Sequence, residues 1–245
     1  MHHFFVDKSR IGEHEIRIGE ADRNHIRNVL RMKPGERITV SSGGRLSYTC
    51  RIKEYTEEAV VAEILDVRET EQELTSKIWL FQGLPKNDKM ELIIQKAVEL
   101  GVYAVVPMAT KRAVVRLEGK KEETKRRRWQ GIAESAAKQA KRMIIPEIFP
   151  VRPFKEAAAL AEKLDVRLIP YELAEDMAHT REIFSNISPG QSVGLFIGPE
   201  GGFAPEEIEE AVTRYIQPIT LGRRILRTET AGIAALSVLM YLLER

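Results

Sequence analysis

The sequence predicts an α/β protein with a mostly parallel sheet, preceded by a small β-rich domain. After residue 73, short apolar runs rich in β-branched residues alternate with longer helical patterns, which is typical of β-α-β units. Before residue 73, strand-like runs follow one another with a single helical pattern among them. At 245 residues, of which 43% are hydrophobic, the chain can bury two cores of unequal size. We therefore expect domains over residues 1–72 and 73–245.

In the first domain we expect strands over residues 3–7, 36–44, 46–55 and 59–67. Gly43 and Gly44 end the second of these runs, at a position that favours a hairpin turn. Residues 21–32, "ADRNHIRNVLRM", predict the one helix, with its apolar residues spaced for one face.

In the second domain five apolar runs predict strands, over residues 78–84, 104–108, 166–172, 193–198 and 218–222. Helical patterns follow four of these runs, over residues 87–101, 125–142, 205–215 and 228–244. Pro205 stands where one helix begins, with acidic residues in its first turn. Strands joined through helices predict a largely parallel sheet.

The net charge of +2 conceals a basic middle segment, since residues 77–145 contain 16 Lys and Arg against 7 Asp and Glu. One face of the helical pattern over 125–142 is polar and mostly basic, with Arg128, Ser135, Lys138 and Arg142. An apolar stripe that starts at Trp129 runs beside this face. Such a helix suits contacts with nucleic-acid phosphates, and the alternative is a solvated surface helix.

Two glycine-containing turns follow strands of the second domain, "GPEGG" at residues 198–202 and "LGRRILRTET" at residues 221–230. Each joins a strand to a helix and therefore offers backbone N–H groups and the positive end of a helix dipole to an anion or nucleotide-like ligand. Because ligands of parallel sheets bind at the carboxyl ends of strands, we expect both turns to converge with the turn that begins at Tyr171. The alternative is that the glycines only permit tight turns.

Other classes of site find no support in the sequence. The glycine turns match neither the dinucleotide-binding nor the phosphate-loop pattern. The five histidines lack paired ligand spacing, so we expect no metal, and the single Cys50 excludes an internal disulfide and suits a reducing cytoplasm. We see no signal peptide, and the longest apolar run, "GIAALSVLMYLL", is too short to cross a bilayer, so we expect a cytoplasmic protein without membrane insertion.

Four segments together resemble one family: "NHIRNVLRM", "LPKNDKMELIIQKAVELGV", "GPEGGF" with its following "EEI", and "LGRRILRTETA". They are similar to the RsmE family of small-subunit (16S) ribosomal RNA uridine-N3 methyltransferases in the SPOUT superfamily. The resemblance implies a PUA-like β-barrel domain that binds RNA, followed by a SPOUT-type domain with a C-terminal trefoil knot. It also implies S-adenosyl-L-methionine as the cofactor, 16S ribosomal RNA or the small ribosomal subunit as the substrate, and a homodimer. The sequence departs from the family where an acid commonly precedes Gln139, because Lys138 stands there.

The resemblance also implies site residues. The catalytic candidates are Arg227, which would stabilise a uridine anion, and Glu200. The cofactor-binding candidates, among which Leu221, Ile225 and Leu226 would wall the adenine, are Tyr171, Ile197, Gly198, Pro199, Glu200, Gly201, Gly202, Leu221, Gly222, Arg224, Ile225, Leu226, Arg227 and Thr228. The RNA-binding candidates are His25, Arg31, Lys86, Lys89, Arg112, Arg128, Gln139 and Arg142.

Several of these assignments have alternatives. Glu200 could instead stabilise its loop as an acid near a helix start, and Arg227 could form a salt bridge there. The helix that carries His25 and Arg31 could merely pack on its own domain. At the level of the whole protein, the alternatives are a SPOUT-type methyltransferase of ribose 2′-oxygen or guanine N1, or a non-catalytic RNA-binding protein.

Overall fold

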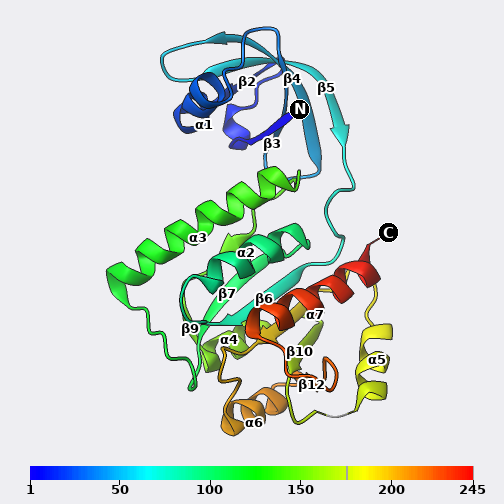
Figure 1. The fold of residues 1–245 in the computed structure, drawn as a ribbon. Coiled ribbons are helices and arrows are strands. Elements are labelled where there is room, and N and C mark those ends of the chain that lie inside the picture. Colours follow the sequence, from blue (N-terminus) through cyan, green and yellow to red (C-terminus); the bar gives the residue numbers. More distant parts are fainter. Residues whose placement is uncertain (175, 245) are drawn as a thin grey trace. The chain divides into compact units, whose positions relative to one another are not determined.

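The computed structural model describes residues 1–174 and 176–244, except for the side chain of Ala21. The chain forms two compact units (Figure 1). The first contains Met1–Glu73 and Ala137–Ile145, and the second contains Leu74–Ala136 and Pro146–Arg245. The first boundary lies near the change of pattern in the sequence. The inclusion of the segment Ala137–Ile145 in the first unit was not expected.

The first unit is built on a five-stranded sheet of order β1-β3-β4-β5-β2. Its strands are β1 (His2–Phe5), β2 (Glu15–Ile18), β3 (Arg37–Ser41), β4 (Leu46–Tyr55) and β5 (Val60–Glu69). The hairpin expected at Gly43 is confirmed: β3 and β4 pair antiparallel up to Ser41 and Ser47, and Gly43 has φ +79°. Alternating residues of these strands close a small core that includes Phe4, Ile38 and Ile52.

The expected helix over residues 21–32 is shorter and less regular than its sequence pattern suggests. A short α1 (Glu20–Asn24) passes directly into a π-helical turn (His25–Val29), and a separate 3₁₀ turn covers Lys8–Arg10. The Leu30 N–H bonds to the carbonyl of His25, and Arg31 then adopts a left-handed φ of +52°. The buried Ile26 holds this wider turn to the core, so packing overrides the regular α-helical period here.

Two acidic residues of the first unit, Glu73 and Asp22, bind the segment Ala137–Ile145. Glu73 accepts hydrogen bonds from the Arg142 guanidinium at 2.5 Å and from the backbone N–H groups of Met143 at 2.7 Å and Ile144 at 3.2 Å. The Arg142 side chain is only 6% exposed. Lys138 adds a 2.8 Å ion pair with Asp22.

The second unit contains the predicted parallel sheet, of order β12-β10-β11-β6-β7-β8, with β9 also paired to β7. Every pairing in it is parallel. The strands are β6 (Ile78–Gly83), β7 (Ala104–Ala109), β8 (Glu147–Ile148), β9 (Arg152–Pro153), β10 (Val166–Pro170), β11 (Val193–Ile197) and β12 (Gln217–Ile219). Both central strands, β6 and β11, are buried along their whole length, as their continuous apolar runs predict.

Helices cover both faces of this sheet (Figure 1). On one face, α4 (Phe154–Ala161) and α6 (Pro205–Thr213) pack on aromatic residues of the strands, where the Phe81 and Phe196 rings stack 4.3 Å apart. On the other face, α7 (Thr228–Leu243) lies beside α2 (Lys89–Glu99) and contacts β11. The remaining helices are α5 (Met177–Ser185) and α3 (Gly119–Gln139), which begins and ends earlier than expected.

The sequence patterns for α2, α6 and α7 predicted these helices closely, and Pro205 is the first residue of α6. The sequence patterns predicted neither α4 nor α5. No helix within residues 1–174 and 176–244 is long and apolar enough to cross a membrane.

Candidate functional site

The three turns that we expected to converge follow three adjacent strands. Because β12, β10 and β11 are neighbours and parallel, their carboxyl ends lie along one edge of the sheet. The backbone N–H of Tyr171 donates a 3.0 Å hydrogen bond to the carbonyl of Ile219, so the turn that begins at Tyr171 starts beside the turn that begins at Leu221. The first turn runs over residues 171–176, of which residue 175 lies outside the described residues. The arrangement is that of a ligand site in an open α/β sheet.

Glycines permit the closest backbone approach at this edge. A Cβ atom on Gly83, at the end of β6, would lie 2.6 Å from Cδ of Pro199, and one on Gly198 would lie 3.1 Å from the backbone of Gly202. Only glycine allows so close an approach at position 83, and at position 198 any larger residue would press on the backbone of Gly202. By contrast, a Cβ on Gly202 or Gly222 would meet no described atom within 4 Å, so both turns face open space.

A buried side chain joins two of the turns. Gln82, in β6, donates a 2.9 Å hydrogen bond from Nε2 to Thr228 Oγ1, and the Thr228 hydroxyl donates a 2.6 Å hydrogen bond to the carbonyl of Gly198. Thr228 is the first residue of α7 and Gly198 opens the "GPEGG" turn. We did not select Gln82 from the sequence, although a lone amide in the apolar run "IWLFQGL" was a signal that could have identified it.

Glu200, at the tip of the "GPEGG" turn, bonds to the start of α2. Its carboxylate accepts hydrogen bonds from the Lys86 N–H at 3.1 and 3.2 Å, and Lys89 Nζ lies 3.0 Å from Glu200 Oε1 and 3.4 Å from Glu229 Oε2. Partial burial raises the pKa of Glu200, but hydrogen bonds from its own N–H, Lys89 and Lys86 outweigh burial and hold this pKa below its ordinary value of 4.5. These contacts are those of an ionised carboxylate that holds its loop.

The turn over residues 221–227 presents basic side chains to solvent. Arg223, Arg224 and Arg227 are exposed, and Ile225 is 88% exposed. Leu221 and Leu226 are half-buried. Arg227 occupies the position before α7, where its carbonyl accepts a 2.8 Å hydrogen bond from the Ala231 N–H. The backbone of Arg227 is therefore held at the point where this turn meets α7.

The loop after β7 packs on the same edge. Arg112 Nη1 donates a 3.1 Å hydrogen bond to the carbonyl of Gly201. The buried Glu207 of α6 accepts from the Lys111 N–H and the Ala204 N–H, both at 2.8 Å. The sequence did not identify the contact between Lys111 and Glu207, because these two residues lie 96 positions apart along the chain.

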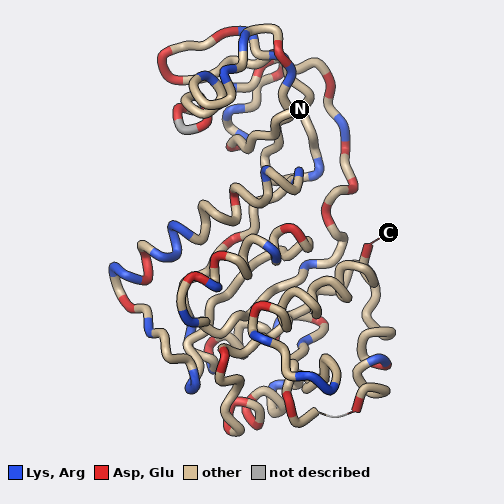
Figure 2. Tube along the Cα trace, viewed as in Figure 1, with Lys and Arg blue, Asp and Glu red and all other residues tan. Residues whose placement is uncertain are grey.

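The RNA-binding candidates of the second unit differ in their availability. Lys86 and Arg112 are exposed, whereas Lys89 is ion-paired as described above. Arg128 is exposed too, but both ends of its guanidinium contact Glu91 of α2, at 2.8 and 2.9 Å. Figure 2 shows that the basic residues of α3 gather in the first half of the helix, with acidic residues between them.

In the first unit, His25 and Arg31 are exposed on the π-helical turn and just after it, and Gln139 is exposed at the end of α3. Arg142 is buried against Glu73, which favours a structural role for its guanidinium over contact with RNA. Its assignment to RNA binding stays a prediction that the burial does not support.

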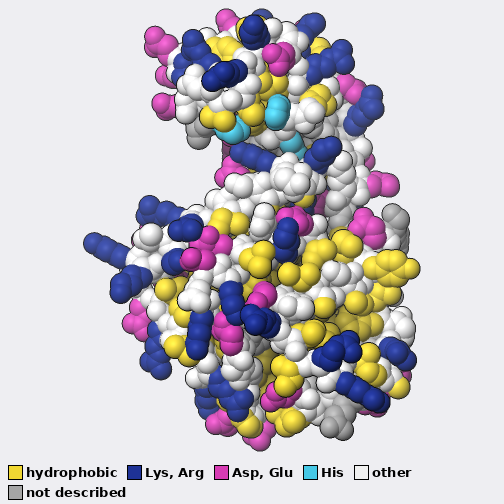
Figure 3. Space-filling model, in the orientation of Figure 1, with side chains coloured by type: hydrophobic (Ala, Val, Ile, Leu, Met, Phe, Trp, Pro, Cys, Tyr) yellow, Lys and Arg dark blue, Asp and Glu magenta, His cyan; other side chains and the backbone are white. Residues whose placement is uncertain are grey.

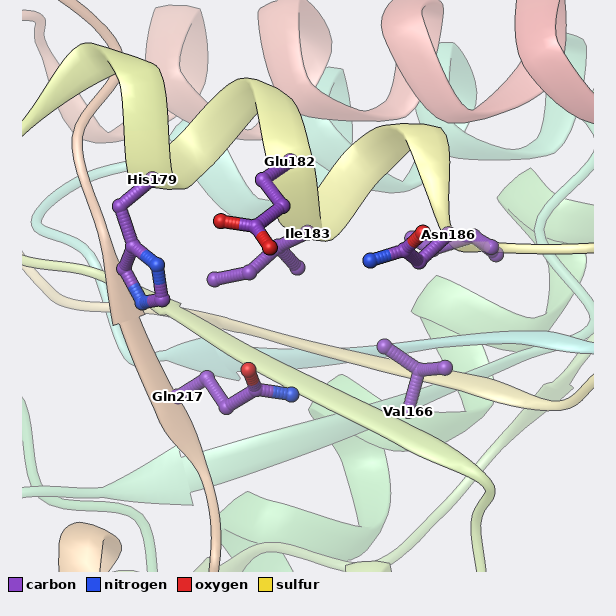
Figure 4. A pocket seen from close by; sticks show the side chains of 7 residues that line it. Val166, His179, Glu182, Ile183, Asn186 and Gln217 are labelled. Atoms are coloured by element: carbon purple, nitrogen blue, oxygen red, sulfur yellow. The ribbon is translucent and has the colours of Figure 1, made fainter.

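A separate pocket of about 270 Å³ lies between α5 and the amino-terminal ends of β10 and β12 (Figure 4). His179 and Glu182 of α5 line it together with Asn186, which follows α5, and with Gln217 of β12. None of the predicted site residues lines this pocket. Within the described part of the chain, no group of three or more His, Cys, Asp or Glu side chains is placed to hold a metal ion.

Comparisons with known proteins agree with this arrangement. A family model for an RNA methyltransferase domain matches residues 72–240, and one for an RNA methyltransferase PUA domain matches residues 18–65. Ribosomal RNA small subunit methyltransferase E of Bacillus subtilis is 35% identical over 224 residues, which are 90% of this chain and 88% of that protein. The protein of the same name from Mesomycoplasma hyopneumoniae is 33% identical over 237 residues, 97% of this chain and 98% of that protein.

Among solved structures, the ribosomal RNA small subunit methyltransferase E of Neisseria gonorrhoeae bound to S-adenosyl methionine matches with a TM-score of 0.85 at 31% identity. The match covers 99% of this chain and 98% of that one. On these grounds the chain belongs to the ribosomal RNA small subunit methyltransferase E family.

Proposed function

We propose that this enzyme, an S-adenosylmethionine-dependent methyltransferase of 16S ribosomal RNA, methylates N3 of a specific uridine in the small ribosomal subunit. The observation that carries the cofactor part of this proposal is the convergence of glycine-containing turns at the carboxyl edge of the sheet, tied by the 2.6 Å hydrogen bond from Thr228 to Gly198. The uridine-N3 specificity rests on the resemblance of the sequence motifs to the RsmE family.

The turns fit the cofactor chemically. S-adenosylmethionine carries an adenine edge, a ribose and a charged amino-acid end, all of which backbone N–H and C=O groups can bind. Gly202 and Gly222 leave open space in front of this backbone. The proposed binding residues are those of three segments: Tyr171; residues 197–202; and residues 221, 222 and 224–228.

When bound, the cofactor supplies an electrophilic methyl group on a sulfonium. The N3 of uridine carries a proton, and it becomes a good nucleophile only when that proton has gone to solvent or to a base. We assign the exposed guanidinium of Arg227 to stabilising the resulting anion, because this residue stands directly before Thr228, through which the two turns are joined. Attack by this anion would form the bond between N3 and the methyl carbon as the methyl–sulfur bond breaks, with its electron pair left on the sulfur.

Glu200 fits the role of a loop anchor better than that of the base. Its lowered pKa makes it a weak proton acceptor, and its oxygens already accept from Lys86 and contact Lys89. We therefore assign the carboxylate to holding the "GPEGG" turn against α2.

For the RNA, we propose contacts from exposed residues of both units: His25, Arg31 and Gln139 in the first, and Lys86, Arg112 and Arg128 in the second. The first unit, which corresponds to residues 1–72 with a short added segment, would act as the PUA-like RNA-binding domain. A target base turned out of a structured RNA needs such contacts, because its own edge offers too little binding energy.

We further propose a homodimer that acts in the cytoplasm, with a trefoil knot in the second domain. Exposed hydrophobic side chains gather over α7 (Figure 3), among them Val238, Tyr241 and Leu242, at 44%, 81% and 37% exposure. An apolar helix face of this kind favours coverage by a second copy of the chain.

Nucleoside analysis tests the reaction. Small subunits and naked 16S RNA that lack the modification are incubated with enzyme and labelled S-adenosylmethionine, then digested and separated. We expect label in 3-methyluridine. Label in a 2′-O-methylated nucleoside or in 1-methylguanosine would overturn the uridine-N3 assignment while leaving cofactor binding intact.

A further inference from the structure

Gln82 is a fully buried polar residue in a strand whose other side chains are apolar. It lies near the carboxyl end of β6, opposite Ile197 of β11, and its side chain reaches the first residue of α7. An apolar residue of the same size would be easier to bury here, because a buried amide must find partners for all of its polar atoms. The amide therefore needs an explanation in the function or the geometry of this edge.

The orientation of the amide follows from its neighbours. Nε2 donates to the carbonyl of Gly83 at 3.0 Å, a group that only accepts, and to Thr228 Oγ1 at 2.9 Å. The Thr228 hydroxyl uses its own proton in the 2.6 Å bond to the carbonyl of Gly198. A flipped amide would place Oε1 against the Gly83 oxygen, so the hydrogen bonds admit only this direction.

These hydrogen bonds use both amide protons of Gln82 and leave its amide oxygen without a donor. Gln82 Oε1 is buried and accepts no hydrogen bond from the described residues. An unpaired buried acceptor lowers the stability of the fold. The amide is thus placed for its two donors rather than for the stability of the strand.

The Thr228 hydroxyl joins the two glycine-containing turns through its bond to the Gly198 carbonyl, and the Gln82 amide holds Thr228 in place from β6. Gly198 opens one turn, and Thr228 closes the other directly after Arg227. We propose that Gln82 is a positioning residue that sets the spacing of these two turns through the Thr228 hydroxyl, and so tunes the affinity for S-adenosylmethionine. This inference rests on the proposed function, since it takes the turns to be the cofactor site.

Two near-isosteric substitutions test the inference from opposite ends of the chain of bonds. Gln82→Met removes both amide donors, and Thr228→Val removes the hydroxyl. Calorimetric titration of the full chain with S-adenosylmethionine, without RNA, should give a Kd raised by about tenfold for each variant. Thr228→Ser keeps the hydroxyl and should weaken binding less than Thr228→Val does.

The double variant, which combines Gln82→Met with Thr228→Val, shows whether the two residues act together or independently. Because Gln82 and Thr228 act through one chain of bonds, the combined loss of affinity should be smaller than the product of the two single losses. Ile78→Val, a buried change in the same strand at its other end, is the control for lost stability. It should lower the melting temperature and leave the Kd within about twofold of the wild-type value.

If Gln82→Met and Thr228→Val melt earlier but bind S-adenosylmethionine as tightly as the wild type, the amide is only structural and the inference is wrong. If Gln82→Met does not fold, Gln82→Leu, which also lacks both amide donors, takes its place in the titration. A wild-type protein that binds no S-adenosylmethionine would instead overturn the proposed cofactor site, and with it the inference.

Discussion

The Lys89 ammonium, in the first residue of α2, lies 3.0 Å from Oε1 of Glu200 in the "GPEGG" turn. A cation at the start of a helix is unfavourable for the helix dipole, and this ion pair compensates for it. The same contact ties the expected cofactor turn to the neighbouring helix. The contact therefore favours the role of a loop anchor for Glu200 over that of a general base.

Glu200→Gln should lower the free energy of unfolding by about 1 kcal/mol at neutral pH, because it removes the ion pair of a partly exposed carboxylate. The pKa of Glu200 is lower in the folded chain than its ordinary value of 4.5. Its stabilising contribution is therefore present above that value and disappears as the pH falls through the lowered pKa. Urea denaturation of both proteins between about pH 8 and pH 3 should show a constant difference that shrinks only below about pH 4.5. Turnover of the variant should fall by less than about tenfold; a loss of several hundredfold would identify Glu200 as the base.

Arg227→Ala should lower the rate of methyl transfer by about 100-fold, because it removes the cation that stabilises the uridine anion. Single-turnover kinetics at saturating S-adenosylmethionine isolates this step from cofactor binding. Arg223→Ala changes an exposed arginine of the same turn and should stay within about threefold of the wild type. Equal losses for both arginines would point to general attraction of RNA and remove the special role of Arg227.

Gly83→Ala should lower the free energy of unfolding by about 2 kcal/mol and weaken cofactor binding strongly, because the new methyl group would press on Pro199 and displace the turn. Thermal unfolding and calorimetric titration measure the two effects. The control is Gly131→Ala in α3, where a Cβ meets no described atom within 4 Å. In a helix interior this change should raise stability by up to about 1 kcal/mol. Normal cofactor affinity in Gly83→Ala would show that the turn tolerates displacement.

Arg142→Ala should lower the free energy of unfolding by about 3 kcal/mol, since it leaves Glu73 without its buried partner. Chemical denaturation gives the value. The matched change is Arg127→Ala in α3, which removes an exposed ion pair with Glu123 and should leave the free energy of unfolding almost unchanged. If Arg142→Ala keeps the stability of the wild type but binds RNA more weakly, the result would instead support the phosphate contact that the sequence predicted for Arg142.

The combined substitution Val238→Glu and Tyr241→Glu should convert a dimer into a monomer, because it places two charges on the exposed apolar face of α7. Light scattering at about 10 µM protein measures the mass. Val212→Glu alters an equally exposed apolar residue on α6 and should leave the dimer intact. A wild-type monomer at this concentration would contradict the proposed assembly.

Much of the fold could be predicted from local patterns. The apolar runs of β6 and β11, the start of α6 at Pro205 and the hairpin at Gly43 follow from residue spacing and turn chemistry, which act over a few residues. Local periodicity predicted one regular helix over 21–32, and the packing of Ile26 changed it into a π-helical turn. Local sequence preferences determine the type of a helix or strand only where packing against the core does not require a different helical repeat.

The sequence by itself therefore determined the α/β class, the strand-to-helix turns at Gly198 and Leu221, and the motifs that indicate an RNA methyltransferase. Only the tertiary structure decided which residues meet. Gln82 and Thr228 are 146 positions apart, and Arg142 and Glu73 are 69 apart. The physical reason is that a buried amide or guanidinium takes its role from the partner that the fold brings within hydrogen-bond distance, and no local pattern encodes that partner.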